Sequence, residues 1–474
     1  MKTYPLYLNG EFVTSEPAWD VLNPATGEAF ARISTIDRKR VAQALADANA
    51  AFGPWRQLTA KARGEFLRKM ASEVERRREE IARLICSENG KPLAQGLGEV
   101  AMTVDHLQWF AEEGRRAYGR IIPPQANGKR NLVVKTPIGV VGAISPWNFP
   151  LVLAVRKVAP ALAAGCPVVL KPARQTPLSC VAFAECAHAA GLPKGVLQVV
   201  CGRSDEIGQE FLSNPVCRKV TFTGSTEVGR TLIRGAAETI KPLSLELGGN
   251  APLLVFADAD LKVAVEGALL AKMRNTGQSC IASNRLLVHR PIYPQFIEAF
   301  VAGVKALKVG EFTEPGVEIG PLIDEPAFKH AMAMVDDAVH RGARLLCGGR
   351  RLNRQGFFLE PTVLADVTTD SACLHEEIFA PIAPVTAFDT EEEAIRLANS
   401  APYGLSAYAF TRDVGRVFRL ADSLEAGSIG INDGLPTTSN APFGGLKQSG
   451  WGRELGSEGL DAFLETKHVS LGIG

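Results

Sequence analysis

The sequence lacks the features that would place the chain in a membrane or on a nucleic acid. Its longest apolar run, residues 158–170, is short for a membrane span and is interrupted by Pro160 and Pro167. The N-terminus has no apolar core of a secretion signal. The formal net charge is only +1, so no long-range field favours nucleic acid or a charged membrane as a partner. These absences predict a cytoplasmic protein.

Disulfide and metal patterns are also missing. The nine cysteines are odd in number, contain no C-x-x-C pair and stand mostly in apolar surroundings, which predicts reduced thiols and neither a disulfide framework nor a zinc site. His375-Glu376-Glu377 could suggest metal ligation, but adjacent residues of an extended chain point to opposite sides. We therefore predict no bound metal.

The usual dinucleotide fingerprint, G-x-G-x-x-G, occurs nowhere in the chain. The glycines Gly224 and Gly229 open a predicted helix, which could present its amides to a phosphate. A simple glycine turn between a strand and a helix explains the same spacing equally well. This motif alone does not decide between the two.

What is present is the pattern of a large α/β protein. A length of 474 residues calls for two or three lobes, and 46% hydrophobic with 22% charged residues is typical of a globular protein. Strand and helix signals alternate over residues 138–256, which predicts a mostly parallel sheet covered on both faces, and a second α/β segment covers 260–442. The predicted strands are 139–144, 168–170, 196–200, 219–223 and 253–255, with helices at 150–164, 176–190, 205–212 and 225–237.

Helices and a hairpin precede this region. Helical periodicity covers residues 37–52, about 59–86 and 93–116, and Gly53-Pro54 is expected to end the first of these. Two polar extended segments, 119–122 and 131–136, have little core to join. We expect this hairpin to project and to pair with the C-terminal segment 464–471.

Cys280 is the candidate nucleophile. It follows the small and polar residues of Asn275-Thr276-Gly277-Gln278-Ser279, and a thiolate attacks electrophiles readily. A lone cysteine is more often a small buried hydrophobe, so both interpretations stay open on this residue alone. Glu246, which ends a strand-like run and precedes two glycines, is a candidate base for releasing a trapped acyl group by water.

Seven short segments, in a defined order, carry a family resemblance. They are Pro146-Trp147-Asn148-Phe149-Pro150, Lys171-Pro172-Ala173, Phe222-Thr223-Gly224-Ser225-Thr226, Glu246-Leu247-Gly248-Gly249, Gly277-Gln278-Ser279-Cys280, Glu377-Ile378-Phe379 and Pro442-Phe443-Gly444-Gly445. In these segments the chain resembles the aldehyde dehydrogenases over nearly its whole length. The resemblance implies a Rossmann-like parallel-sheet cofactor domain at 1–117 and 138–247, an α/β catalytic domain at 248–445, and a small β oligomerisation element at 118–137 and 446–474. It also implies a homo-oligomer, a dimer or a tetramer.

The resemblance implies a mechanism as well. Cys280 would attack the aldehyde to form a thiohemiacetal, while the Asn148 side chain and the Cys280 backbone N–H hold the oxyanion. Hydride would pass to a nicotinamide cofactor, and Glu246 would activate water to hydrolyse the thioester. The cofactor site would comprise Ser145, Trp147, Lys171, Ala173, Arg174, Gly224, Ser225, Leu247, Glu377 and Phe379.

Arg174 bears on the choice of cofactor. Three residues after Lys171, family members that prefer NAD commonly carry a glutamate that binds the adenosine ribose. An arginine cannot accept hydrogen bonds from ribose hydroxyls, but it can pair with a 2′-phosphate. The resemblance therefore predicts that NADP is preferred and that NAD is used less well.

Two arginines bear on the substrate. Segments 109–114, 320–325 and 450–454 are similar to the succinate-semialdehyde dehydrogenase branch, in which arginines at the positions of Arg156 and Arg274 bind the distal carboxylate. Thr438 lies in a loop, 435–440, that departs from this branch and would line the substrate pocket. The branch often has a second cysteine two residues after the nucleophile; Ala282 stands there, so that redox switch is not expected.

The expected reaction is NAD(P)-dependent oxidation of succinate semialdehyde. Glutarate semialdehyde or a non-acidic aldehyde is the alternative substrate. An acylating dehydrogenase that transfers its thioester to coenzyme A is disfavoured because Glu246 is present. A non-enzymatic relative is disfavoured because Cys280 and Glu246 are both retained.

Overall fold

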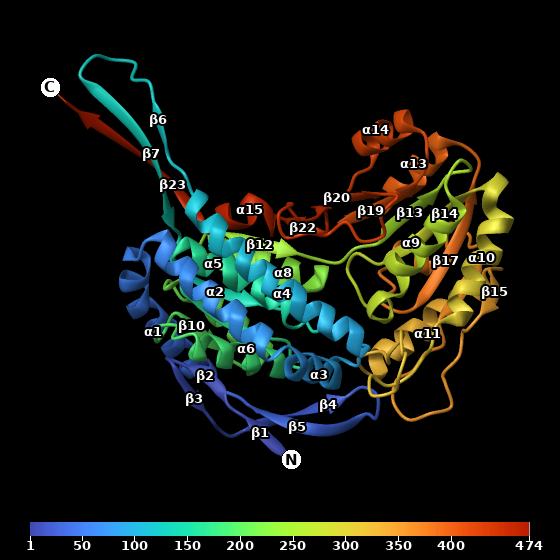
Figure 1. Ribbon diagram of the computed structural model, residues 1–474, viewed down its shortest axis with the longest axis horizontal. Helices are drawn as coiled ribbons and strands as arrows, with labels where there is room; N and C mark the ends of the chain where they lie inside the picture. Colours follow the sequence, from blue (N-terminus) through green and yellow to red (C-terminus); the bar gives the residue numbers. More distant parts are fainter. Residues whose placement is uncertain (474) are drawn as a thin grey trace.

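The chain folds into two lobes and a projecting arm, as shown by a computed structural model that describes residues 1–473 (Figure 1). The lobe that contains the N-terminus is built on an eight-stranded sheet of order β22-β12-β11-β8-β9-β10-β2-β3, in which β12 to β10 run parallel. Its strands are β2 (Leu6–Leu8), β3 (Glu11–Val13), β8 (Val140–Ile144), β9 (Val168–Lys171), β10 (Leu197–Val199), β11 (Cys217–Thr223), β12 (Leu243–Glu246) and β22 (Gly450–Trp451). This arrangement confirms the predicted α/β fold.

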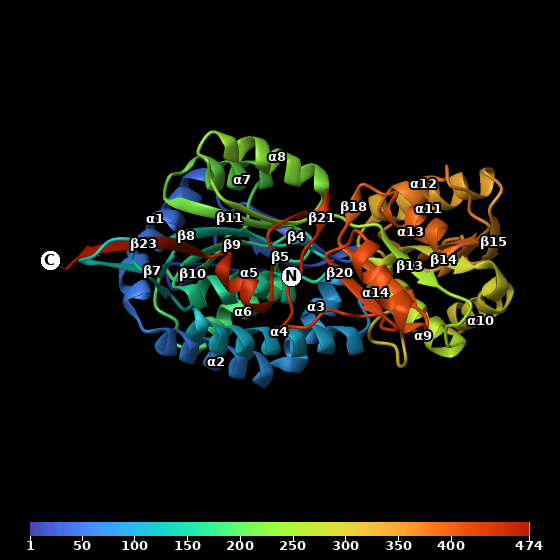
Figure 2. The same cartoon turned by 90° about the horizontal axis from the view of Figure 1, so that it is seen from above.

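Helices cover both faces of this sheet, as an apolar parallel sheet requires. Figure 2 shows α7 and α8 on one side and α2, α4, α5 and α6 on the other. The helices of this lobe are α1 (Arg38–Gln57), α2 (Ala60–Arg76), α3 (Arg78–Asn89), α4 (Leu93–Glu113), α5 (Val152–Ala164), α6 (Leu178–Ala189), α7 (Ser204–Ser213) and α8 (Thr226–Ala237). A separate small sheet, β1 (Lys2–Tyr4), β5 (Glu28–Ser34) and β4 (Ala18–Asn23), precedes them and was not predicted.

The predicted end of the first helix at Gly53-Pro54 is wrong, because α1 continues to Gln57 with Pro54 inside it. Trp55 is fully buried, and its indole N–H donates to the carbonyl of Leu162 in α5 at 3.2 Å. This packing holds one further turn that local sequence would have terminated.

The helix predicted over about 59–86 is also corrected, because it is interrupted at Arg77, whose φ of −101° and ψ of 17° are not helical. The side chain of Arg77 pairs with Glu80 and with Glu185 of α6. Two helices, α2 and α3, therefore stand where one was expected, and a tertiary contact anchors the break.

The second lobe is built on a seven-stranded sheet of order β15-β16-β17-β14-β13-β19-β20, parallel except for β15. The strand predicted at 253–255 belongs to this sheet, not to the first one, because the chain crosses between lobes at Gly248-Gly249. Its strands are β13 (Ala251–Val255), β14 (Ser283–His289), β15 (Arg344–Cys347), β16 (Thr362–Ala365), β17 (Ile382–Phe388), β19 (Ser406–Phe410) and β20 (Ser428–Ile431). Its helices include α9 (Leu261–Met273), α10 (Tyr293–Ala306), α11 (Glu325–His340), α12 (Ala372–His375), α13 (Glu391–Asn399) and α14 (Val414–Ser423).

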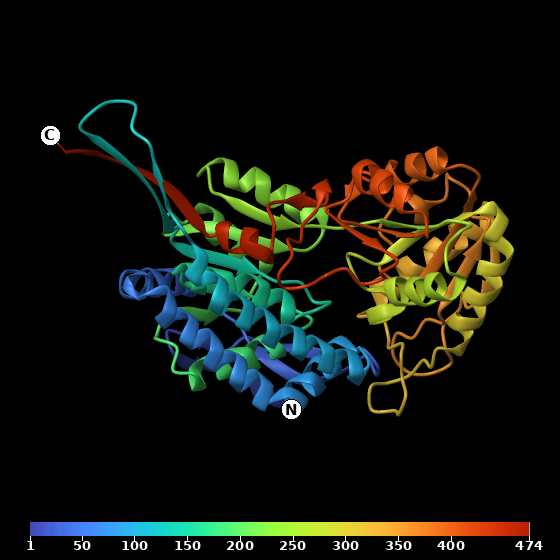
Figure 3. The same ribbon diagram turned by 45° about the horizontal axis from the view of Figure 1, so that its top comes forward.

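The arm is a three-stranded antiparallel sheet of β6 (Arg120–Ile122), β7 (Lys129–Pro137) and β23 (Leu464–Gly472). Its strands, in cyan and red, stand away from both lobes in Figures 1 and 3. Strand β23 pairs with β7 over its whole length, from Leu464 opposite Pro137 to Gly472 opposite Lys129. The predicted pairing of the projecting hairpin with the C-terminal strand is confirmed.

Candidate active site

Cys280 lies in the loop between α9 and β14, where the two lobes meet. A short 3₁₀ turn, Arg274–Gly277, leads into this loop, and Asn275, Thr276 and Gly277 all have positive φ. A Cβ atom at Gly277 would lie 2.2 Å from the carbonyl oxygen of Ala380, so only glycine fits there. Packing between segments of the second lobe therefore shapes the loop that presents the nucleophile.

The Cys280 side chain lines two cavities. One is a cleft of about 570 Å³ that runs along the carboxyl ends of the first sheet. The other is a narrow inner cavity of about 40 Å³ on the opposite side. Burial, together with nearby Glu377 and Glu246, raises the pKa of the Cys280 thiol to about 12. The thiol is therefore neutral near pH 7 and needs a proton acceptor before it attacks.

Asn148 follows strand β8 and is buried beside the nucleophile loop. Its side-chain nitrogen donates to the carbonyl of Gln278 at 3.1 Å, two residues before Cys280. The carbonyls of the preceding residue, Trp147, and of Asn148 itself accept from Asn89 at 3.0 Å and Asn275 at 2.9 Å respectively. The amide is thus fixed in the lining of the cleft beside Cys280, where one of its N–H groups remains for a developing oxyanion.

Glu246 ends strand β12 and is buried, and one of its carboxylate oxygens, Oε2, has no hydrogen-bond partner within residues 1–473. Burial and then the nearby Glu454 carboxylate raise the pKa of Glu246 well above its usual range, against the opposing charges of Lys157 and Arg156. The ammonium of Lys157 pairs with Glu454 and donates to Thr223 at 2.6 Å. A carboxyl group with a raised pKa suits proton transfer near neutral pH.

Arg156 of α5 and Arg274 both line the inner cavity with Cys280. Arg156 is only 6% exposed, and its guanidinium lies over the ring of Phe443, 4.9 Å from the centroid. The guanidinium of Arg274 lies over the ring of Phe149 at 4.8 Å, and it donates to the sulfur of Met102 at 3.8 Å. Within residues 1–473 no carboxylate pairs with either guanidinium.

The structure places Thr437 in the inner cavity, in contrast to the prediction for its neighbour Thr438. The buried Thr437 hydroxyl has no hydrogen-bond partner in the described part of the chain, whereas Thr438 is exposed and donates to Asn440 at 2.8 Å. Extended chain sends adjacent side chains to opposite sides, so a shift of one residue reverses the assignment. No local signal in this irregular loop distinguishes the two threonines.

All ten residues predicted for the cofactor line the cleft. They are Ser145, Trp147, Lys171, Ala173, Arg174, Gly224, Ser225, Leu247, Glu377 and Phe379. Ser225 caps helix α8 by accepting from the Val228 amide at 3.3 Å, so the helix N-terminus faces the cleft beside Gly224. Such a terminus favours an anion such as a pyrophosphate. The Trp147 and Phe379 rings meet edge to face, with centroids 5.4 Å apart.

A carboxylate near the N-terminus of α8 fits a ribose. Glu377 accepts from the amide of Gly249 at 3.0 Å through Oε1. A Cβ atom at Gly248 would lie 2.8 Å from Glu377 Oε2, so the glycine leaves this oxygen room to accept from a ligand hydroxyl. Burial raises the pKa of Glu377 to about 7. Anion site, aromatic pair and carboxylate together fit a dinucleotide.

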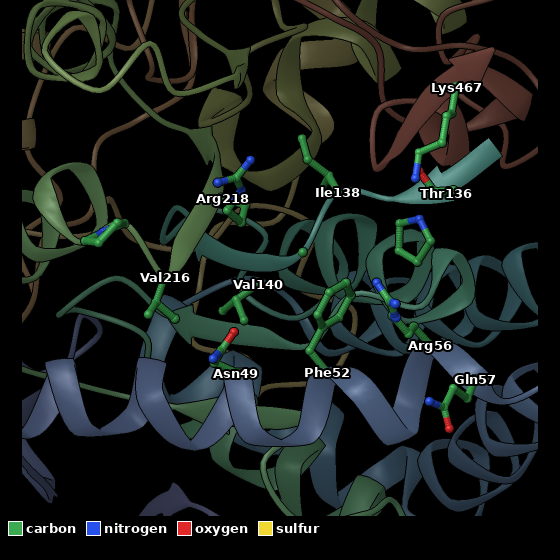
Figure 4. A pocket seen from close by; sticks show the side chains of 13 residues that line it. Asn49, Phe52, Arg56, Gln57, Thr136, Ile138, Val140, Val216, Arg218 and Lys467 are labelled. Carbon is green, nitrogen blue, oxygen red and sulfur yellow. The ribbon is translucent and has the colours of Figure 1, made fainter. Parts of the chain in front are cut away.

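A larger cavity, of about 710 Å³, lies at the foot of the arm (Figure 4). Its lining includes Arg56, Arg218 and Lys467 but no cysteine and no carboxylate. It therefore lacks the groups that acyl chemistry needs.

Among residues 1–473, no group of three or more His, Cys, Asp or Glu side chains could hold a metal. None of the helices described is long and apolar enough to cross a membrane.

Comparisons with known proteins agree with this geometry. Residues 12–469 match the sequence model "Aldehyde dehydrogenase family". The chain is 47% identical to a 3-sulfolactaldehyde dehydrogenase of Pseudomonas putida, covering 98% of this chain and 96% of that protein. It is 46% identical to an NADP(+) succinate-semialdehyde dehydrogenase of Escherichia coli, covering 98% and 97%. A solved succinate-semialdehyde dehydrogenase from Burkholderia pseudomallei is 47% identical and superposes with a TM-score of 0.98, over 99% of this chain and 98% of that one. The chain belongs to the aldehyde dehydrogenase family.

Proposed function

We propose that this enzyme oxidises an aldehyde whose far end carries a carboxylate, with succinate semialdehyde as the first substrate to test and glutarate semialdehyde as the alternative. One observation carries the proposal: Arg156 and Arg274 line the inner cavity with Cys280, and neither has a carboxylate partner among the residues that the structure describes. A buried, unpaired guanidinium is costly. A substrate carboxylate would supply the missing partner and point the aldehyde end toward the nucleophile. The unpartnered hydroxyl of Thr437 would donate a further hydrogen bond.

The residues around Cys280 support acyl chemistry. Cys280 would transfer its thiol proton to solvent, and the thiolate would attack the carbonyl carbon. Asn148 would hold the resulting oxyanion, which lowers the barrier by roughly 3–4 kcal/mol in such sites. When bound in the cleft, the nicotinamide cofactor supplies the hydride acceptor. Glu246 would then take a proton from water as that water attacks the thioester on Cys280. This base disfavours transfer of the acyl group to coenzyme A.

A second candidate substrate carries a sulfonate in place of the carboxylate. A relative at 47% identity is named for 3-sulfolactaldehyde, and a guanidinium pairs with either anion. Its larger head would sit between the same two arginines. The carboxylate remains the first proposal because segments 109–114, 320–325 and 450–454 are similar to the succinate-semialdehyde dehydrogenases.

The test is a comparison of kcat/KM for succinate semialdehyde, glutarate semialdehyde, 3-sulfolactaldehyde and butanal, with and without coenzyme A. Butanal is the uncharged control of similar length. Arg156→Met and Arg274→Met should each lower kcat/KM for the favoured acid aldehyde by roughly ten- to hundredfold relative to butanal, since a charged hydrogen bond contributes about 1.5–3 kcal/mol. Equal losses for the charged and uncharged aldehydes would overturn the assignment. A coenzyme A requirement would favour the acylating alternative.

We also propose that NADP is the preferred cofactor. Arg174 lines the cleft near Lys171, and no carboxylate in the described part of the chain pairs with its guanidinium. An arginine in this position offers parallel hydrogen bonds to a 2′-phosphate. The relative from Escherichia coli is named for NADP(+), which agrees with this choice.

The arm supports a proposal about assembly. Tyr118 and Ile121 are 74% and 75% exposed, and they lie before and within the edge strand β6. Exposed apolar side chains on an unpaired edge favour association with another copy. We therefore propose that the chain forms a homo-oligomer, a dimer or tetramer. The division into three domains that the resemblance implies also stays a proposal. Nine free thiols agree with the proposed cytoplasmic location.

A further inference from the structure

A buried ion pair contacts the backbone of Asn148, next to the loop that carries Cys280. Lys91, which follows α3, and Glu99 of α4 are both 0% exposed, and the ammonium nitrogen lies 2.6 Å from Glu99 Oε2. Neither residue lines the cofactor cleft or the inner cavity. Any effect of this pair on catalysis must therefore pass through the residues that it holds.

The hydrogen bonds of the pair end on the segment that carries Asn148. Lys91 Nζ donates to the backbone carbonyl of Asn148 at 2.8 Å. Glu99 Oε1 accepts from the backbone amides of Leu151 at 2.9 Å and Val152 at 3.2 Å, at the start of α5. The pair thus bonds to the backbone on both sides of Phe149. The Glu99 carboxylate accepts from amides that have no partner within the helix at its start.

The same segment is tied to the nucleophile loop. Asn275 Nδ2 donates to the Asn148 carbonyl at 2.9 Å and to the Gln278 carbonyl at 3.0 Å. The Asn148 side chain donates to that same Gln278 carbonyl at 3.1 Å. Lys91 donates to the same Asn148 carbonyl as Asn275, so it adds a second donor to the contacts that set the position of the Asn148 amide relative to Cys280.

The chemistry of the pair supports a positioning role. Taking two charges out of water is costly, and apolar residues of similar size often stabilise a fold as well as a buried pair does. A charged pair does, however, hold a specific geometry, because both the ammonium and the carboxylate must direct hydrogen bonds to fixed partners. The Lys91 ammonium also lies 4.1 Å from the ring centroid of Phe149, and Phe149 lines the inner cavity.

We infer that Lys91 and Glu99 are positioning residues that hold the Asn148 amide where the oxyanion forms. Lys91 fixes the Asn148 carbonyl, and Glu99 orients Lys91 and anchors the start of α5. This inference rests on the proposed role of Asn148. Small displacements of such an amide are enough to lower the rate by about ten- to hundredfold.

A double-mutant cycle tests the inference. Lys91→Met, Asn148→Ala and the double variant are compared by kcat and KM, using the aldehyde of the panel with the highest kcat/KM, and NADP. Asn148→Ala should lower kcat by about a hundredfold or more. Lys91→Met should lower kcat roughly tenfold in the wild-type background and less than about twofold when Asn148 is already absent. KM and the alkylation rate of Cys280 by iodoacetamide should change little.

Controls separate positioning from simple destabilisation. Lys241→Met is the matched control, because Lys241 is also buried and donates to two backbone carbonyls, those of Phe211 and Asn214, away from the site. It should leave kcat unchanged. If Lys91→Met fails to fold, Lys91→Met/Glu99→Leu removes both charges and replaces it in the cycle.

The possible outcomes are distinct. Equal losses from Lys91→Met with and without Asn148, or no loss at all, would overturn the inference while leaving the proposed function intact. A fully active Asn148→Ala variant would instead overturn the role of Asn148, and the inference with it. A loss that vanishes without Asn148 is the result expected.

Discussion

The guanidinium carbon of Arg174 lies 4.7 Å from the ring centroid of Trp19, which belongs to the small N-terminal sheet. Stacking on an aromatic ring restrains an exposed arginine without using its hydrogen-bond donors. Because Arg174 also lines the cofactor cleft, its N–H groups remain available to a phosphate there.

Arg174→Glu should reverse the cofactor preference. Replacing a positive by a negative charge beside the 2′-phosphate should lower kcat/KM for NADP by at least about tenfold and leave NAD nearly unaffected. Arg396→Glu, an exposed position on α13 of the other lobe, is the matched control and should change neither value. A wild-type enzyme that prefers NAD would contradict the prediction.

Cys280→Ala should abolish turnover while cofactor binding stays intact, because the covalent step then has no nucleophile. Cys347→Ala is the control, since Cys347 is the other cysteine that is not fully buried, and it should retain full activity. Steady-state rates and cofactor titration make the comparison. Residual activity of Cys280→Ala above about a hundredth of wild type would exclude covalent catalysis at this residue.

Glu246→Gln should slow hydrolysis of the thioester, because the amide cannot take a proton from water. The acyl-enzyme should then accumulate and appear as a mass increase in intact-protein mass spectrometry after mixing with aldehyde and NADP. The double variant Cys280→Ala/Glu246→Gln should show no adduct. An unchanged rate with no adduct would argue against Glu246 as the base.

Cofactor affinity should rise with pH through about 7. The pKa of Glu377 is raised to about 7 by burial, against the lowering effects of the Gly249 amide and the Lys272 charge. Below this pH the carboxyl is protonated and accepts ribose hydroxyl hydrogens poorly. If only the carboxylate binds, affinity should increase by up to about tenfold between pH 6 and pH 8. Glu377→Gln should bind more weakly and without this pH dependence, as measured by fluorescence titration; a parallel slope in both proteins would refute the assignment.

Deleting residues 462–474 should remove the edge strand β23 and leave the backbone groups of β7 on that side unpaired. Light scattering should then detect monomers or aggregates in place of the oligomer. Tyr118→Ser/Ile121→Ser is the milder variant, because it keeps the sheet and removes only exposed apolar surface. An active, well-folded oligomer after the truncation would contradict the role of the arm.

Local sequence determined the types of most elements and the identities of the reactive groups. Alternating strand and helix signals predicted the parallel sheet, and the family resemblance carried by short motifs implied the roles of Asn148, Glu246 and Cys280. The strand and helix pattern depends on residues close together in the chain, so periodicity reports it directly.

Tertiary structure decided what depends on distant contacts. The burial of Trp55 extends α1 beyond Pro54, and the pairing of Arg77 with α6 anchors the break between two helices. The side of a loop that faces a cavity distinguishes Thr437 from Thr438. Lys91 and Glu99 are eight residues apart in sequence, but their contact with the Asn148 segment forms only in the tertiary structure. Packing between segments far apart in the chain decides these helix ends, side-chain orientations and contacts, so no local sequence pattern predicts them.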